Sequence, residues 1–280
     1  MKLTSYLPQA MVNGRLLATG ELRVSPLGDG FMFGHGLFET IKVQGGLPIL
    51  LEDHWTRLAA SARELGLGAI SHERELRSRC VQVAAANKLM AGVLKVIVFQ
   101  EVNEVSELIF ARPSLYSQEQ YTTGFRLRTV AGSGRSGKFF AHKTLNYLQN
   151  STAKNEAVAA GFDEALFVDE SGNLLECATS NIFVVRGGRV HTPPCDGRIL
   201  PGVARGRLLR LLGYRAHEKM VSMELLRDAD EVFVTNALLG IMPVACVDEQ
   251  VFDLTRNAVT RELIATYNAK EVKRPDEFVT

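Results

Sequence analysis

The chain has 280 residues, enough for one large domain or two smaller ones with a substantial core. Its 32 Lys and Arg residues nearly balance its 31 Asp and Glu residues, so the composition offers no global basic surface for nucleic acid. No apolar run approaches the length of a membrane span, and the N-terminus lacks the apolar core of a signal peptide. The four cysteines stand far apart without metal-ligand spacing, which indicates reduced thiols in a cytoplasmic protein with no structural metal.

The N-terminal part of the chain alternates between strand and helix patterns. Asn13-Gly14 is typical of a hairpin turn, and residues 38–43 alternate between apolar and polar side chains as a strand does. Gly34 and Gly36 flank His35, which suggests that the backbone there approaches another segment closely. Other elements follow in order: helices over residues 53–65 and 71–90, and strands over residues 94–99 and 107–111. We therefore predict a small α/β domain over residues 1–112 and a connector over residues 113–135.

The central stretch from His142 to Val185 contains a lysine and a glutamate on successive elements. Lys143 opens an apolar run at roughly helical spacing that ends at Gly161, which predicts a helix. Residues 165–177 predict a hairpin whose second strand contains Glu176, and a carboxylate buried there requires a partner. An arbitrary lysine and glutamate on neighbouring elements most often form an ordinary ion pair.

Two later positions suit an anion. Pro201-Gly202 precedes an apolar helix, whose first backbone N–H groups have no partner within the helix. A predicted buried strand ends in small polar residues at Asn236, and the backbone there could also bind an anion. Residues 254–267 predict a further surface helix. We assign residues 136–280 to a larger C-terminal domain.

Three segments together resemble the class IV aminotransferase family, the pyridoxal 5'-phosphate enzymes of fold type IV. They are residues 142–185, the Phe-Gly-x-Gly-x-Phe-Glu pattern at residues 33–39, and the His-x-x-Arg-Leu pattern at residues 54–58. The resemblance extends from about Val12 to Phe252. It implies an α/β (α+β) fold with a small N-terminal α/β domain and a larger β-rich, pseudo-barrel C-terminal domain with flanking helices. It also implies a cofactor between the domains and a homodimer.

The resemblance assigns roles to particular residues. Lys143 supplies the amine for the Schiff base, and Glu176 is the acidic partner of the ring nitrogen. Tyr147 is the residue that would hydrogen-bond the ring hydroxyl. The phosphate contacts that match the family are Arg57, Val203, Ala204, Asn236 and Ala237.

The family includes 4-amino-4-deoxychorismate lyase, branched-chain aminotransferases and D-amino acid aminotransferases. Thr40 stands where lyases have a catalytic hydroxyl, and the segment 235–244 resembles the lyase version, so we predict a lyase that releases p-aminobenzoate and pyruvate. His35 and the short loop at residues 100–106 depart from the family pattern. The alternatives are an aminotransferase acting on amino acids and, from another class, a binding protein that holds the cofactor without turnover.

Overall fold

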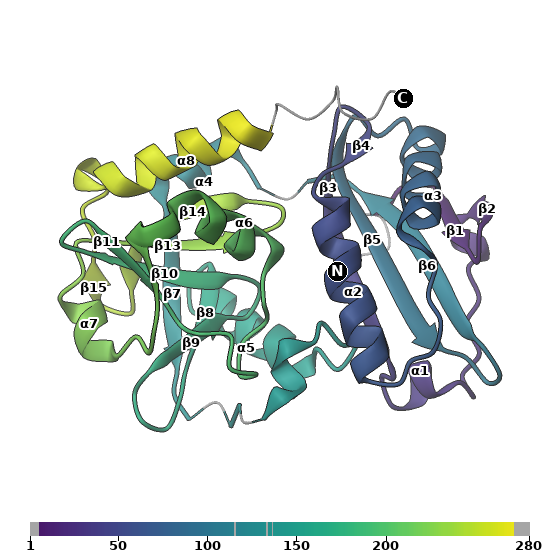
Figure 1. Ribbon diagram of the computed structural model, residues 1–280, viewed down its shortest axis with the longest axis horizontal. Coiled ribbons are helices and arrows are strands. Elements are labelled where there is room, and N and C mark those ends of the chain that lie inside the picture. The colour runs from purple at the N-terminus through teal and green to yellow at the C-terminus, as the bar shows by residue number, and fades with distance from the viewer. Residues whose placement is uncertain (1–5, 115, 133, 136, 272–280) are drawn as a thin grey trace. The chain divides into compact units, whose positions relative to one another are not determined.

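The computed structural model describes residues 6–114, 116–132, 134–135 and 137–271 (Figure 1). Within these ranges the chain forms two compact units: unit 1 contains residues 6–114 and 142–147, and unit 2 contains residues 116–141 and 148–271. These bounds differ from the domains expected from the sequence, because residues 142–147 cluster with unit 1. Residues 115 and 133 of the predicted connector lie outside the described residues.

Unit 1 is a sheet in the order β2-β1-β6-β5-β3-β4 with its two longer helices on one face (Figure 1). Its strands are β1 (Gln9–Val12), β2 (Arg15–Ala18), β3 (Gly36–Gln44), β4 (Leu47–Pro48), β5 (Ala91–Gln100) and β6 (Val105–Arg112). Its helices are α1 (Asp29–Met32), α2 (Leu51–Glu64) and α3 (Glu73–Ala86), which confirms both predicted helices with slightly shifted ends.

The hairpin between β1 and β2 is the one predicted from Asn13-Gly14. Both residues have positive φ, 48° and 82°, as the favoured two-residue hairpin turn requires. Farther along the chain, alternation in β3 gives the sheet two different faces. Leu37 and Ile41 join the apolar core beneath α2 and α3, so Phe38 and Thr40 point to the opposite face.

Unit 2 contains a closed ring of strands, which confirms the β-rich pseudo-barrel. The sheet runs β12-β11-β10-β13-β14-β7-β8-β9, and β9 pairs back onto β10 through Glu176 and Asn181. The strands are β7 (Phe125–Val130), β8 (Glu164–Val168), β9 (Leu174–Cys177), β10 (Asn181–Arg186), β11 (Arg189–Thr192), β12 (Ala216–Glu218), β13 (Glu231–Asn236), β14 (Gly240–Val247) and β15 (Gln250–Val251).

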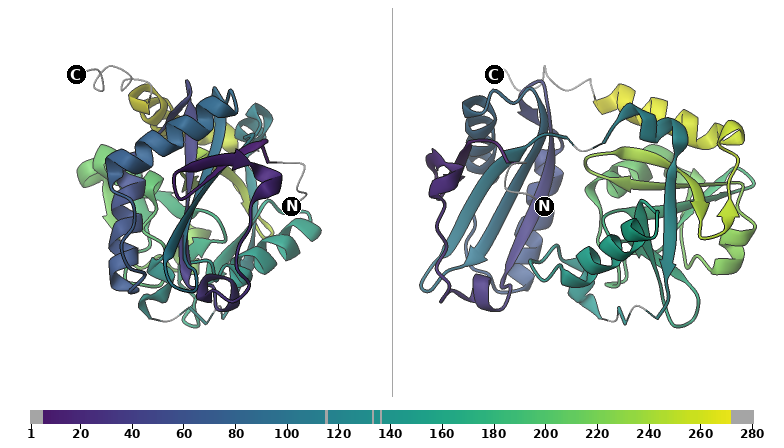
Figure 2. Two further views of the ribbon diagram at one scale, coloured as in Figure 1. Left: turned by 90° about the vertical axis from the view of Figure 1, so that its right-hand side faces the viewer. Right: turned by 180° about the vertical axis from the view of Figure 1, so that it is seen from behind.

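Helices cover the outside of this ring, and Figure 2 shows them from two further sides. They are α4 (Gln118–Thr123), α5 (Leu148–Ala159), α6 (Val203–Leu212), α7 (Met223–Arg227) and α8 (Ala258–Glu271). Alternation again sorts the core: Ile182 and Val184 face the ring interior, whereas Phe183 packs with Leu208 of α6 and Leu263 of α8. Among the described helices, none combines the length and apolar character that crossing a membrane requires.

The helix expected to begin near Lys143 begins later, at Leu148. Residues 142–147 instead run alongside β3, where Thr144 forms an antiparallel bridge with Leu37. The prediction was wrong here because the edge of β3 offers backbone partners to this segment, and those hydrogen bonds override the helical spacing of its apolar residues.

Candidate active site

Lys143 is held in place by backbone hydrogen bonds to the edge of β3. The Phe38 N–H donates to the Lys143 carbonyl at 2.9 Å, and the Leu145 N–H donates to the Gly36 carbonyl at 3.0 Å. Because Thr144 lies opposite Leu37, its neighbour Lys143 lies opposite Phe38, on the sheet face away from α2 and α3. The register therefore directs the lysine to the same face as Thr40.

Two glycines of β3 and the preceding turn let the lysine segment approach. A Cβ at Gly34, whose φ is +66°, would lie 2.6 Å from the Asn146 side chain, and one at Gly36 would lie 2.7 Å from the Leu145 side chain. Such distances exclude any larger residue unless the segment moves. The close backbone approach predicted from these glycines is confirmed, and the segment approached is the one that contains Lys143.

Aromatic rings surround the Lys143 amine. Its Nζ lies 4.5 Å from the centre of the Phe38 ring and 5.3 Å from that of Tyr147. The two rings contact edge to face, with centres 5.2 Å apart. Tyr147, expected near the cofactor, therefore lies beside Lys143 within unit 1, while Thr40 is half-buried two residues beyond Phe38 on the same face.

A second lysine belongs to this face and was missed by the sequence analysis. Lys95 of β5 pairs directly with Thr40 across the sheet, and its Nζ lies 3.6 Å from the centre of the Phe38 ring. The available signal was a single charge inside the otherwise apolar run of β5, at a position that alternation assigns to the face opposite the core.

Arg57, expected to hold the cofactor phosphate, is bound to Glu39 through two N–H donors. Its Nε and Nη2 donate to the two carboxylate oxygens at 2.8 and 2.6 Å, and His54 contacts the same carboxylate at 2.6 Å. Burial opposes the charge of Glu39, but Arg57 and His54 outweigh it and lower its pKa from 4.5 to about 2. Since a guanidinium has five N–H donors, this pairing fixes the side chain and is compatible with a phosphate contact.

In unit 2, Glu176 is buried in β9, the strand predicted for it, and it is paired with a cation that was not expected. Arg135 donates from Nη1 to one carboxylate oxygen at 2.6 Å, and its guanidinium stacks 3.9 Å from the centre of the Phe167 ring. Asn150 fixes the other arm of Arg135 at 2.8 Å. The requirement for a buried partner was foreseen, whereas Arg135, 41 residues earlier in a glycine-rich segment, was not.

The second oxygen of Glu176 is tied to the segment that leads into α6. The Leu200 N–H donates to it at 3.1 Å and Asn181 Nδ2 at 3.2 Å, while Asn181 also donates to the Leu200 carbonyl at 2.9 Å. A Cβ at Gly202 would lie 2.0 Å from Asn181 Oδ1, so the backbone passes directly against that side chain. One hydrogen-bond network therefore sets both the glutamate and the start of α6.

The start of α6 has the properties of an anion site. Gly202 is its N-cap residue and provides no side-chain hydrogen bond to the first turn, which contains Val203 and Ala204. The N–H groups of its first turn have no partner within the helix and point out along its axis. The helix is ten residues long, and its dipole places partial positive charge at this end. These residues fit a phosphate group at the place that the sequence predicted.

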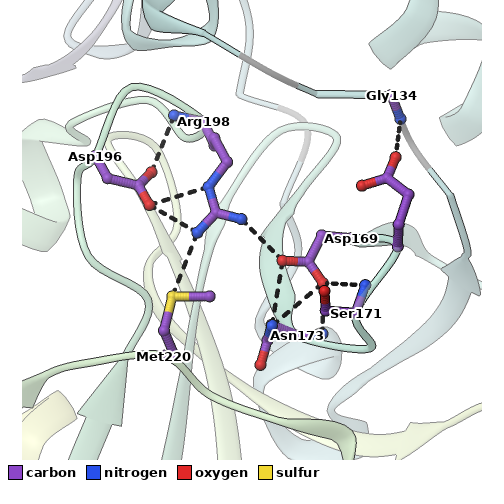
Figure 3. A network of polar contacts seen from close by, with 8 residues as sticks. Gly134, Asp169, Ser171, Asn173, Asp196, Arg198 and Met220 are labelled. Atoms are coloured by element: carbon purple, nitrogen blue, oxygen red, sulfur yellow. Dashed lines mark hydrogen bonds and ion pairs between the residues drawn. The ribbon is translucent and has the colours of Figure 1, made fainter.

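The loop before Leu200 is fixed by a network around Arg198 (Figure 3). Arg198 donates to Asp196 at 2.7 Å and to Asp169 at 2.8 Å. Burial disfavours the charge of Asp169, but hydrogen bonds from Asn173 and Arg198 outweigh it and hold the Asp169 pKa below its usual value. This network ties the turn after β8 to the segment approaching α6.

At the end of β13, the Asn236 side chain stabilises the turn. Its Oδ1 accepts from the N–H groups of Leu238 and Leu239 at 2.9 and 3.0 Å, and its Nδ2 donates to the Thr179 carbonyl at 3.3 Å. Because the side chain is engaged in this way, a phosphate contact near Asn236 and Ala237 would come from the backbone.

The candidate residues therefore fall into two sets. Unit 1 brings together Lys143, Tyr147 and Thr40 on one sheet face and holds Arg57 on α2. Unit 2 contains Glu176, Val203, Ala204, Asn236 and Ala237.

Comparison with known proteins identifies relatives that span nearly the whole chain. The family profile described as amino-transferase class IV matches residues 36–247. The chain is 28% identical to the D-alanine aminotransferase of Bacillus licheniformis, over 90% of this chain and 95% of that protein. It is also 28% identical to the aminodeoxychorismate lyase of Bacillus subtilis, over 94% of each.

Among solved structures, the branched-chain aminotransferase of Thermoproteus uzoniensis has a TM-score of 0.87, with 26% identity over 98% of this chain and 97% of that one. The matched relatives are thus aminotransferases and lyases, and they do not single out one reaction. Enzymes of this family depend on pyridoxal 5'-phosphate. The matched segment covers most of the chain and includes strands of both units, so the protein belongs to the class IV aminotransferase family.

Proposed function

We propose that Lys143 is the residue that binds pyridoxal 5'-phosphate covalently and that Glu176 is the acidic partner of its ring nitrogen. We further propose that Arg57 and the backbone N–H groups at Val203, Ala204, Asn236 and Ala237 hold its phosphate, with Tyr147 near its ring hydroxyl. The α6 start and the Glu176 network support this proposal, because one backbone segment, residues 200–203, sets both an anion site and a buried carboxylate.

The proposed reaction is the release of p-aminobenzoate and pyruvate from 4-amino-4-deoxychorismate. When bound, the cofactor supplies an electron sink for the carbon that bears the substrate's amino nitrogen. Lys143 would remove the proton from that carbon, and the neighbouring enol-ether C–O bond would then break as the ring becomes aromatic. No oxidant is required, since one substrate divides into two products.

One observation carries the choice of a lyase. The register of β3 against residues 142–147 directs Thr40 and Lys143 to the same sheet face. Lys143 lies opposite Phe38, and Thr40 follows Phe38 by two residues in β3. A hydroxyl on that face can position or relay a proton next to the lysine. Aminotransfer remains the second candidate, because the chain is as similar to a D-alanine aminotransferase as to an aminodeoxychorismate lyase.

A paired assay separates the two reactions. Cofactor-loaded protein is given 4-amino-4-deoxychorismate, and in parallel panels of L- and D-amino acids with a keto acid acceptor. We expect p-aminobenzoate from the first substrate, a loss of about 100-fold in kcat for Thr40→Val, and near-complete retention for Thr40→Ser. Amino transfer without p-aminobenzoate would refute the lyase and support the aminotransferase.

The lysine assignment has its own test. Borohydride reduction of the loaded protein followed by peptide mass analysis should find the cofactor on the peptide that contains Lys143. Lys143→Ala should lose both this adduct and activity. If Lys143→Ala left the function of the protein unchanged, the protein would instead be a binding protein that does not turn over substrate.

We also propose that the protein is a cytoplasmic homodimer, as the family resemblance implies. One chain has a mass of 30.8 kDa, and light scattering of the loaded protein should give twice that mass. A monomer at micromolar concentration would contradict this assignment.

A further inference from the structure

The face that contains Lys143 has a second amine, and the backbone fixes both. Lys95 lies opposite Thr40 in the β3–β5 ladder, one diagonal step from Phe38. Its Nζ lies 3.6 Å and that of Lys143 4.5 Å from the centre of the same Phe38 ring. The two nitrogens are therefore closer together than one Debye length, about 10 Å at 0.1 M salt, so their charges interact.

The charges around Lys95 come from three elements. The lysine segment contributes Lys143, β6 contributes Arg112, and β3 contributes Glu39. Lys42 of β3 and Tyr147 beside Lys143 are the further titratable residues near this face. Burial is the largest influence on Lys95, followed by repulsion from Lys143 and then from Arg112. Glu39 opposes them only in part, and the pKa of Lys95 falls from 10.5 to about 7.

These properties suit proton transfer better than structural support. An ammonium over an aromatic ring gains cation–π stabilisation, yet here two cations share one ring. A residue that exchanges its proton near the working pH is the most efficient general acid or base, and an ordinary lysine is fully protonated there. The roles proposed for Lys143 and Thr40 leave this amine without a function.

We propose that Lys95 is a second catalytic residue of this site, the general acid that protonates the oxygen of the leaving enolpyruvyl group. This inference rests on the proposed lyase reaction. Lys143 takes the proton from the substrate carbon, the enol-ether C–O bond breaks, and its electron pair stays on the oxygen. The Lys95 ammonium gives that oxygen a proton, which yields the enol of pyruvate.

The proton balance then closes within the site. After the step, Lys143 holds one proton more than before and Lys95 one fewer. Transfer from the first amine to the second, along the face that Thr40 shares, restores both without net uptake or release. The enol converts to pyruvate by moving its own proton from oxygen to carbon, for which no further reactant is required.

The variants Lys95→Arg and Lys95→Met separate charge from proton donation. Arginine keeps the positive charge but cannot release its proton near neutral pH, and methionine keeps the packing of the aliphatic stem. We expect kcat for p-aminobenzoate release to fall by about 100-fold or more in both. Lys42→Gln, on the same face of β3, is the matched control and should retain kcat within about twofold.

The pH profile identifies the direction of transfer. In the wild type, kcat should decline as the pH rises through the neutral range, because Lys95 loses the proton that it must donate. Lys95→Arg should lack this decline. A wild-type kcat in Lys95→Arg, or a profile unchanged by the substitution, would overturn the inference while leaving the lyase intact.

A measurement independent of turnover uses protein with ¹³C-labelled lysine ε carbons. In cofactor-free protein, where the Lys143 amine is not bound to the cofactor, one resonance, absent from Lys95→Arg, should titrate near pH 7 and shift to higher pH in Lys143→Ala, where the repelling amine is gone. A Lys95 resonance that titrates above about pH 9 in the wild type would overturn the inference. Failure of the wild type to form p-aminobenzoate would overturn the lyase, and this inference with it.

Discussion

Two buried carboxylates, Glu39 in unit 1 and Glu176 in unit 2, are each paired with an arginine but in different ways. Glu39 is bound by Arg57 and His54, which both lie on α2 and are three residues apart. Glu176 receives donors from three separate segments, at Arg135, Asn181 and Leu200. The comparison indicates that Glu39 fixes a single helix and its arginine, whereas Glu176 gathers loops around the position proposed for the ring nitrogen.

The largest expected effect is on activity, from Glu176→Gln. A glutamine cannot supply the negative charge that favours a protonated ring nitrogen, so we expect kcat to fall by about 1,000-fold. Steady-state kinetics of the cofactor-loaded variant would measure this loss. Activity within tenfold of the wild type would show that another group supplies the charge.

The double variant Arg135→Met/Glu176→Gln is the control. Glu176→Gln alone leaves the Arg135 cation buried without its partner carboxylate, which costs about 3–5 kcal/mol of unfolding free energy. Replacing Arg135 as well removes that cost, so the double variant should recover stability in urea unfolding and stay inactive. If both properties return together, the loss of activity came from unfolding.

Glu39→Gln should instead act mainly on stability. It leaves Arg57 without its carboxylate in a buried setting, and we expect a loss of about 3–5 kcal/mol in the free energy of unfolding, measured in urea. Glu104→Gln, in the exposed turn between β5 and β6, is the matched control and should change stability by less than about 0.5 kcal/mol. A loss of unfolding free energy below about 1 kcal/mol for Glu39→Gln would mean that water reaches the Glu39–Arg57 ion pair.

The same pair predicts a dependence of stability on pH. The pKa of Glu39 is about 2 in the folded chain and 4.5 ordinarily, so its contribution is complete above pH 4.5. As the pH falls from 4.5 towards 2, the unfolded chain binds the proton first, and up to about 3 kcal/mol is lost. Unfolding free energies of the wild type and Glu39→Gln should therefore converge below pH 4.5. A constant difference down to pH 3 would contradict this assignment.

Local sequence patterns predict some of these elements but not others. The Asn13-Gly14 hairpin, the strand of Glu176 and the start of α6 follow from local turn chemistry and alternation, so they were foreseen. The position of Lys143 was not, because backbone bonds to the distant β3 outweigh the helical spacing around it.

Long-range partners were harder still. Alternation places Glu39 with Leu37 and Ile41 on the core side of β3, which could have flagged a buried carboxylate. Nothing local points to Arg135 as the partner of Glu176, since the pairing depends on how distant loops meet.

The smallest expected effect comes from the network in Figure 3. Arg198 and Asp196 are partly exposed, 24% and 38%, so solvent screens their pairing. We expect Arg198→Gln to lower the unfolding free energy by about 1 kcal/mol or less, because Asn173 and Ser171 still bond Asp169.

Cofactor affinity of Arg198→Gln tests which contact sets the α6 start. Asn181 donates to the Leu200 carbonyl and Leu200 donates to Glu176, so that segment is held without Arg198. We therefore expect the dissociation constant for pyridoxal 5'-phosphate, measured by absorbance titration, to change less than threefold. A loss of tenfold or more would mean that the anion site depends on the Arg198 network, and that the donors gathered by Glu176 do not suffice to position it.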